Sequence, residues 1–266
     1  MKNILLNALL CTLLPIVSAQ AGVKDDRVKV RGAPAQPEPP GATLPATAKD
    51  PVERFIESNV LETLFHELAH ALIDKMNLPV FGPEEYAADF FAAVLLDRLH
   101  DDATTRQLVE DVLASYRYDA QGESPVAWDE HGSPMQRYYN LACLYYGADP
   151  DNRKAALTAF NLPEDRADSC PAEYEQANFA WGGVLDELSD GAPGKSITLD
   201  WVLDRDSHLT RYVLKEMEAL NQMIVLPEPI VVSVIPCGEV NAYYDPEKDE
   251  IIMCTELTDH LGNIAP

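Results

Sequence analysis

Residues 50–79, "DPVERFIESNVLETLFHELAHALIDKMNLP", have the features of one long helix. Asp50 is a typical N-cap residue, and Pro51 suits the first helical position. Apolar residues then recur at helical spacing as far as Met76, and Asn77 and Pro79 end the pattern. The sequence therefore predicts a helix over residues 51–76.

Two histidines of this helix, His66 and His70, stand four residues apart, and Glu67 directly follows the first. Positions four apart lie on one helix face, about 6 Å from each other, so both imidazoles can bind one cation. Glu67 lies about 100° round the helix, where it reaches a water molecule beside the cation better than the cation itself. This H-E-x-x-H spacing is typical of zinc peptidases.

A catalytic zinc ion needs a third protein ligand and one open position. We expect Glu85, in "PEEYAADFF" at the start of the next helix, to be that ligand. Asp89, one turn later on the same face, would accept the second N–H of a liganding histidine and fix its tautomer. Glu84 is the neighbouring alternative ligand. In the alternative interpretation, Glu85 only favours a helix N-terminus and Asp89 is a solvated residue.

The rest of the chain predicts a mainly helical α+β fold with a small C-terminal sheet. Further helices are expected at about 82–100, 103–117, 134–147, 151–160, 171–189 and 207–224. Strands are expected only near the end, at 229–235, 240–244 and 250–254. The turn "DPEKD" between the last two predicts a hairpin.

The N-terminal part predicts export. Residues 1–21 have a basic start and an apolar stretch too short to span a bilayer, with cleavage after Ala19 or Ala21. Residues 22–50 form a Pro/Ala-rich linker without apolar periodicity, which we expect to be disordered, and residues 51–266 form one domain. The mature protein would be periplasmic or secreted, without stable membrane insertion. An uncleaved N-terminal anchor is the alternative.

Charge and cysteines narrow the classes further. The net charge of −24 disfavours nucleic acid as a partner. Signal cleavage removes Cys11 and leaves four cysteines, an even count that suggests two disulfides in an exported chain. We favour Cys143–Cys170 and Cys237–Cys254, because each pair closes a short loop. Four buried thiols are the alternative.

Five blocks in order resemble a bacterial family of uncharacterised function whose members are classed as metallopeptidases. They are "HELAHALI", "LPVFGPEEYAADFFA", "QRYYNLACLYYGADP", "LPEDRADSCPAEYEQA" and "CGEVNAYYDPEKDEIIMCTEL". The resemblance covers about residues 52–260. One departure is Ala69, where the family has glycine, and its methyl group slightly narrows the space beside the metal.

The wider resemblance is to gluzincins, whose ligands are two histidines and a later glutamate. It implies a zincin-like fold in which His66, His70 and Glu85 bind Zn²⁺. It also implies that Glu67 is the general base and that Asp89 makes the outer contact to a liganding histidine.

In the neprilysin-like gluzincins, an N-A-[FY]-Y stretch forms a strand edge that binds the substrate backbone. Asn241, Ala242 and Tyr243 match it here, but they follow the metal helix instead of preceding it. The resemblance therefore implies a permuted order, which requires strand 240–244 to lie beside the helix of His66. An ordinary hairpin with its tyrosines packed on the core is the alternative.

These patterns predict an exported zinc-dependent metallopeptidase that hydrolyses a peptide or protein substrate, with Glu67 taking a proton from water. For the group that stabilises the oxyanion, His131 is the first choice, oriented by Asp129, although His131 also suits an ordinary surface position. Competing groups are Arg137, Tyr138, Tyr139 and Tyr243. We assign no role to His100, His208 and His260.

Two other classes of function stay open. One is a zinc-containing envelope protein that binds a peptide or protein with little or no turnover. The other is a structural envelope protein whose motif is coincidental.

Overall fold

The structure is a computed structural model that describes residues 50–122, 126–189 and 194–266. The predicted signal peptide (1–21) and the predicted linker (22–50), except Asp50, lie outside the described residues. The described part is mainly helical with a four-stranded sheet near the C-terminus, which confirms the predicted α+β class.

The described helices and strands follow in chain order. They are α1 (Pro51–Met76), α2 (Glu84–Leu99), α3 (Asp102–Asp119), α4 (Pro134–Ala148), α5 (Ala155–Ala159), α6 (Glu164–Ala167), α7 (Cys170–Ser189), β1 (Ile197–Val202), α8 (His208–Met223), β2 (Ile230–Ile235), β3 (Ala242–Asp245), β4 (Glu250–Cys254) and α9 (Glu256–Ile264).

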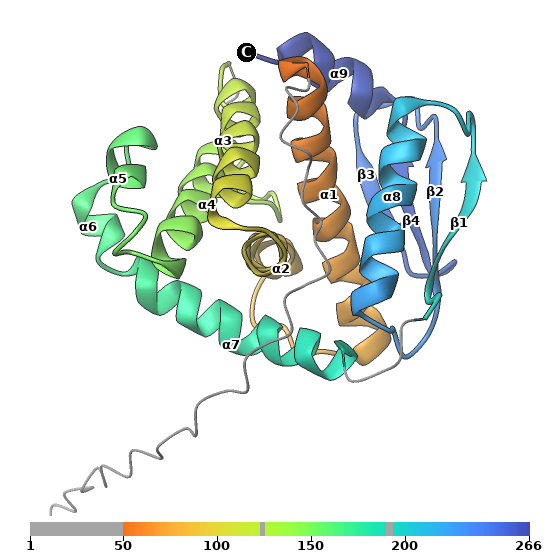
Figure 1. Ribbon diagram of the computed structural model, residues 1–266, viewed down its shortest axis with the longest axis horizontal. Coiled ribbons are helices and arrows are strands. Elements are labelled where there is room, and N and C mark those ends of the chain that lie inside the picture. The colour runs from red at the N-terminus through yellow and green to blue at the C-terminus, as the bar shows by residue number, and fades with distance from the viewer. Residues whose placement is uncertain (1–49, 123–125, 190–193) are drawn as a thin grey trace, which may run out of the picture. The chain divides into compact units, whose positions relative to one another are not determined.

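Helix α1 lies between helices α2, α3 and α4 on one side and the sheet with α8 on the other (Figure 1). As predicted, the side chain of Asp50 caps it by accepting from the Val52 N–H at 2.9 Å, and Asn77 ends it in the left-handed conformation. Between residues 55 and 73 every position is buried except Thr63 and His70, and both of these line a cavity. The H-E-x-x-H motif therefore lies on the most enclosed helix of the described fold.

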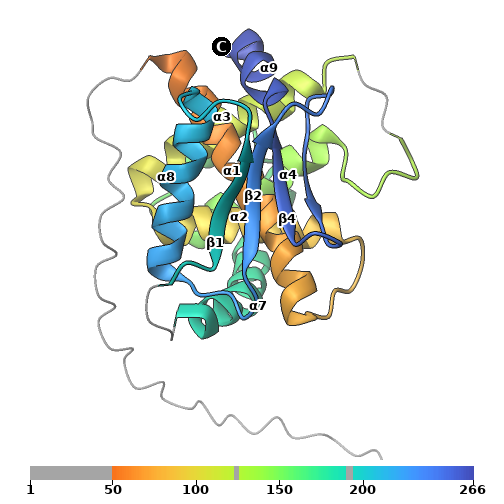
Figure 2. The same cartoon turned by 90° about the vertical axis from the view of Figure 1, so that its right-hand side faces the viewer.

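The sheet has the strand order β1-β2-β4-β3, and Figure 2 shows β1, β2 and β4 side by side. The first three strands are parallel, while β3 pairs antiparallel with β4 and lies at the edge. This confirms the hairpin over residues 240–254. The Tyr244 hydroxyl donates to Asp74 Oδ2 of α1 at 2.8 Å, so the edge strand lies against the motif helix.

Three elements, β1, the four-residue α6 and α9, were not predicted from the sequence. The expectation of strands only near the end is wrong, because β1 forms a parallel pair with β2 across the intervening helix α8. Helix α9 buries only Leu257 and Leu261, four residues apart, which is too short a pattern to separate from a loop. Helix α5 is also shorter than the expected 151–160.

Both favoured disulfides are formed. Cys143–Cys170 joins α4 to the start of α7, with an S–S distance of 2.06 Å. Cys237–Cys254 ties the segment before β3 to the end of β4, at 2.00 Å. The second disulfide therefore anchors the hairpin that carries the edge strand.

Among the described helices, no segment is both long enough and apolar enough to cross a lipid bilayer.

A close packing contact between α4 and α7 yields a stability prediction. A methyl group on Gly147 would lie 2.1 Å from the carbonyl oxygen of Cys170, so Gly147→Ala should lower the free energy of unfolding by about 3 kcal/mol. Urea denaturation with the disulfides intact measures this. The matched control is Gly183→Ala on α7, where the added methyl meets nothing within 4 Å and should leave stability within about 1 kcal/mol. Equal effects of the two changes would contradict the packing argument.

Candidate metal centre

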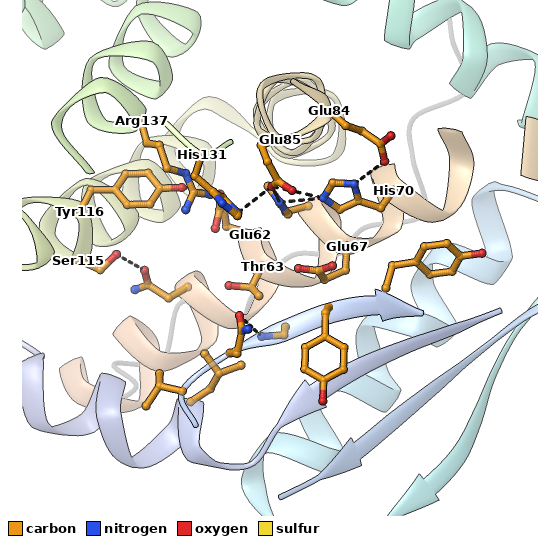
Figure 3. Close-up of a pocket in the computed structure, with 18 of the residues that line it drawn as sticks. Glu62, Thr63, Glu67, His70, Glu84, Glu85, Ser115, Tyr116, His131 and Arg137 are labelled. Carbon is orange, nitrogen blue, oxygen red and sulfur yellow. Dashed lines mark hydrogen bonds and ion pairs between the residues drawn. The ribbon is translucent and has the colours of Figure 1, made fainter. Parts of the chain in front are cut away.

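Helix α1 and the first turn of α2 bring the three predicted ligands together (Figure 3). The Nε2 atoms of His66 and His70 are 3.2 Å apart. Glu85 Oε2 lies 3.0 Å from Nε2 of His66 and 3.5 Å from Nε2 of His70. Three potential ligand atoms therefore converge on one point.

This convergence fits a zinc ion. Zinc bonds of 2.0–2.1 Å in tetrahedral geometry separate neighbouring ligand atoms by about 3.3–3.4 Å, close to the three distances found. The Nδ1 atoms of both histidines face carboxylates, so an N–H on each Nδ1 is hydrogen-bonded there, and both Nε2 atoms face the Glu85 oxygen. Three acceptors at such close range require protons or a cation between them.

Asp89 makes the outer contact that the sequence predicts. Its Oδ1 lies 2.9 Å from Nδ1 of His66, and its side chain is only 11% exposed. Arg137 donates two hydrogen bonds to the same carboxylate, at 2.6 and 3.0 Å. Burial opposes ionisation of Asp89, but Arg137 and the hydrogen bond to His66 outweigh it and lower its pKa. Arg137 therefore fixes a charged Asp89, which in turn orients His66.

Glu84 makes the equivalent contact to the second histidine. Its Oε1 lies 2.7 Å from Nδ1 of His70, on the side of the ring that faces away from the convergence point. The sequence indicates Glu84 only as an alternative ligand. Two consecutive glutamates at the start of α2 thus reach opposite nitrogens of one imidazole.

Glu67 is buried and lines the same cavity. Burial raises its pKa, partly offset by the two neighbouring histidines and by a hydrogen bond from the backbone of Tyr244. A carboxylate with a raised pKa is a better proton acceptor near neutral pH. The pKa of Glu85 moves the other way: burial opposes its ionisation, but hydrogen bonds from His131, His66 and His70 lower the pKa well below its ordinary value.

His131 reaches the centre from the loop before α4. Its Nε2 lies 2.8 Å from Glu85 Oε2, and its ring is stacked on that of His66 at 6.3 Å. Asp129 accepts the backbone N–H of His131 at 3.0 Å and lies 3.4 Å from its Nδ1. The predicted pair is therefore present, and half of the His131 side chain stays exposed.

Of the four other candidates for stabilising the oxyanion, two line the cavity and two lie away from it. The hydroxyl of buried Tyr138 donates to the backbone oxygen of Phe160, away from the cavity lining. Tyr139 packs edge-on against Tyr138, also away from the lining. Arg137 is held by Asp89, as described, and Tyr243 lines the cavity.

The cavity has a volume of about 800 Å³ and runs along α1. One wall is the edge strand, with Asn241, Ala242 and Tyr243. Strand 240–244 therefore lies beside the helix of His66, as the permuted arrangement requires. The Asn241 side-chain oxygen accepts from the Ala242 N–H at 2.9 Å, which leaves its amide NH₂ as the group available to a ligand.

Other cavity residues were not found from the sequence. Glu62 and Asn59 of α1 lie one and two turns before His66, and that helical spacing was a usable signal. Ser115 and Asp119 of α3, and Leu257, His260 and Leu261 of α9, reach the cavity through the packing of distant segments. No local pattern indicates them.

An H-E-x-x-H helix with a carboxylate beside both imidazoles, a buried glutamate and an edge strand in one cavity is an arrangement typical of metal-dependent peptidases. Comparison with family profiles agrees. Residues 43–185 and 205–265 match the family DUF4344, described as "Putative metallopeptidase", and the chain belongs to this family. Searches of curated proteins and of solved structures gave no match.

Metal binding should release protons. Burial alone would lower the pKa of His66, but hydrogen bonds to Asp89 and Glu85 raise it to about 10, and the pKa of His70 is raised as well. At pH 7.5 a cation must therefore displace protons, and its affinity should fall as the pH is lowered. Calorimetric titration with zinc in two buffers of different ionisation enthalpy should show at least one proton released per ion. Identical heats in both buffers would contradict this.

The outer carboxylates should affect zinc affinity unequally. Asp89→Asn should weaken zinc binding by about 10–100-fold, because it removes the charge that orients His66. Glu84→Gln should weaken zinc binding less than Asp89→Asn does, since the Glu84 side chain is 45% exposed and its charge is screened by water. Competition with a chromophoric chelator gives both affinities, and circular dichroism checks that both variants fold. A larger loss for Glu84→Gln would contradict the assignment.

Proposed function

We propose that this protein is an exported zinc-dependent metallopeptidase that hydrolyses peptide bonds with Glu67 as general base. The observation that carries the proposal is the shared cavity. It holds the converging His66, His70 and Glu85, the buried Glu67 and the edge strand β3.

His66, His70 and Glu85 would hold the zinc ion, which supplies a Lewis acid that lowers the pKa of water to about 7 and polarises a carbonyl. Glu67 accepts a proton from the attacking water and passes it to the leaving amine. The raised pKa of Glu67 supports this role, because proton transfer in both directions needs a group that is neither strongly acidic nor strongly basic.

The edge strand supports binding of an extended peptide. Among the described strands β3 pairs only with β4, so no described strand covers its other edge, where an extended substrate could add. Ala242 leaves room for the peptide backbone, and the Asn241 amide can donate to a substrate carbonyl. Tyr243 is more than one third exposed at the same edge.

His131 would stabilise the oxyanion. Its Nε2 is already within the cluster of ligand atoms, and Asp129 lies on the other ring nitrogen. Its raised pKa, caused mainly by the hydrogen bond to Glu85, favours a protonated donor near neutral pH.

Export rests on the N-terminal segment and the cysteines. The apolar stretch and cleavage pattern of residues 1–21 are those of a signal peptide, and both disulfides suit an oxidising compartment. The periplasm or the medium would be the place of action, with peptides or proteins as substrates.

Changing Glu67 to glutamine tests the proposal. The variant keeps the size of the side chain and all three ligands, so it should bind one equivalent of zinc yet cleave peptides about 10²–10⁴-fold more slowly. Hydrolysis of a fluorescence-quenched peptide library and metal analysis give the two readouts. The matched control is Glu218→Gln on the exposed face of α8, which should change neither. Unchanged hydrolysis in Glu67→Gln would refute the mechanism. Peptide binding without turnover in the wild type would favour the zinc-containing binding protein instead.

A further inference from the structure

The cavity extends past the candidate metal centre towards α9. We call this part the α9 end; it is lined by Asn59, Glu62, Ser115, Asp119, Leu257 and Leu261. Figure 3 shows Glu62 and Ser115 on one side of the pocket, and His70 and Glu84 on the other. Nothing in the proposed mechanism uses the α9 end.

Glu62 is the central feature of the α9 end. Its side chain is only 9% exposed, and a buried carboxylate is costly unless it is paired. The Tyr116 hydroxyl donates to Oε1 at 2.7 Å, and Arg137 Nη2 lies 3.6 Å from the same oxygen. Among the described residues, no hydrogen bond to Oε2 is formed, and Glu62 lines the cavity. Glu62 therefore presents the cavity with an acceptor oxygen that a ligand can use.

Two carboxylates line the α9 end, those of Glu62 and Asp119, and His260 Nε2 lies 4.0 Å from Asp119 Oδ1. Arg137 is the only lysine or arginine among the described cavity residues, and Asp89 holds it with two hydrogen bonds. A C-terminal carboxylate or an acidic side chain would be repelled here.

The opposite wall is apolar. Leu257 and Leu261 of α9 are buried and stand four residues apart, on one face of the helix. A cavity with an apolar wall and a carboxylate fits a side chain that has a methylene stem and a cationic head, namely lysine or arginine. A wholly apolar side chain would leave the Glu62 oxygen without a partner.

The direction of β3 indicates on which side of the cleaved peptide bond the α9 end lies. The C-terminal end of β3 lies near Asp74, in the last turn of α1, because the Tyr244 hydroxyl donates to Asp74. The segment before β3 lies at the start of α9, because Glu256 accepts the N–H groups of Cys237 and Gly238. A peptide paired antiparallel to β3, the more stable arrangement, therefore runs from the Asp74 end to the α9 end.

We propose that the α9 end binds the lysine or arginine side chain of one of the two residues that follow the cleaved bond, through Glu62 and Asp119. The inference rests on the proposed function. One helix turn of about 5.4 Å separates Glu62 from His66, which matches the reach of one or two extended residues at about 3.3 Å each.

Two measurements test it. Zinc-loaded wild-type protein is given a library of end-blocked random decapeptides, and the cleavage sites are sequenced. Lysine and arginine should be enriched about tenfold at one of the two positions after the cut. Equal use of all residues there, or enrichment only before the cut, would overturn the proposal.

The second measurement needs no turnover. Zinc-loaded Glu67→Gln protein is titrated with end-blocked alanine-rich decapeptides that carry one central arginine or its neutral analogue citrulline. Arginine should bind about tenfold more tightly, and Asp119→Asn should reduce that ratio. Asp200→Asn, which removes the same charge from an exposed position on β1 at the other edge of the sheet, should keep it. Equal binding of both peptides would overturn the inference. A retained binding ratio without any Glu67-dependent cleavage would instead overturn the proposed function alone.

Discussion

The need to pair every buried polar group governs the centre of this structure. Helix α1 is enclosed on nearly all sides, yet it carries two histidines and two carboxylates in its middle turns. Such groups are tolerated in a core only when each has a partner. The partners come from α2 and from Arg137 at the start of α4, so the contacts that solvate the motif also fix how these three helices pack.

The same constraint explains the order of contacts around His66. Arg137 binds Asp89, Asp89 binds the outer nitrogen of His66, and the inner nitrogen is left facing Glu85. Each link settles the protonation of the next, because an ionised carboxylate holds the imidazole proton on its own side. Arg137 thus acts through Asp89 on which nitrogen of His66 faces the cavity.

Local patterns were enough to predict the motif helix, the second helix and the terminal hairpin. Their capping residues, apolar periodicity and turn residues all lie within a few residues of one another. Glu85 and Asp89 could also be placed, since their spacing matches the chemistry that two histidines require. The edge strand could be placed only through the family resemblance. Strand β1 and helix α9 were missed, because parallel pairing and helix docking join segments far apart in the chain. For the same reason the α9 end of the cavity had no sequence signal beyond the helical spacing of Asn59 and Glu62.

The free edge of β3 has a consequence for solubility. A strand edge that can accept one extended peptide can equally pair with the same edge of another copy, which is a route to aggregation. The short strand, only Ala242–Asp245, and the chain's net charge of −24 both oppose this, because approaching copies repel each other. The acidity of the protein thus protects the uncovered edge of β3 from self-association, and high salt would weaken that protection.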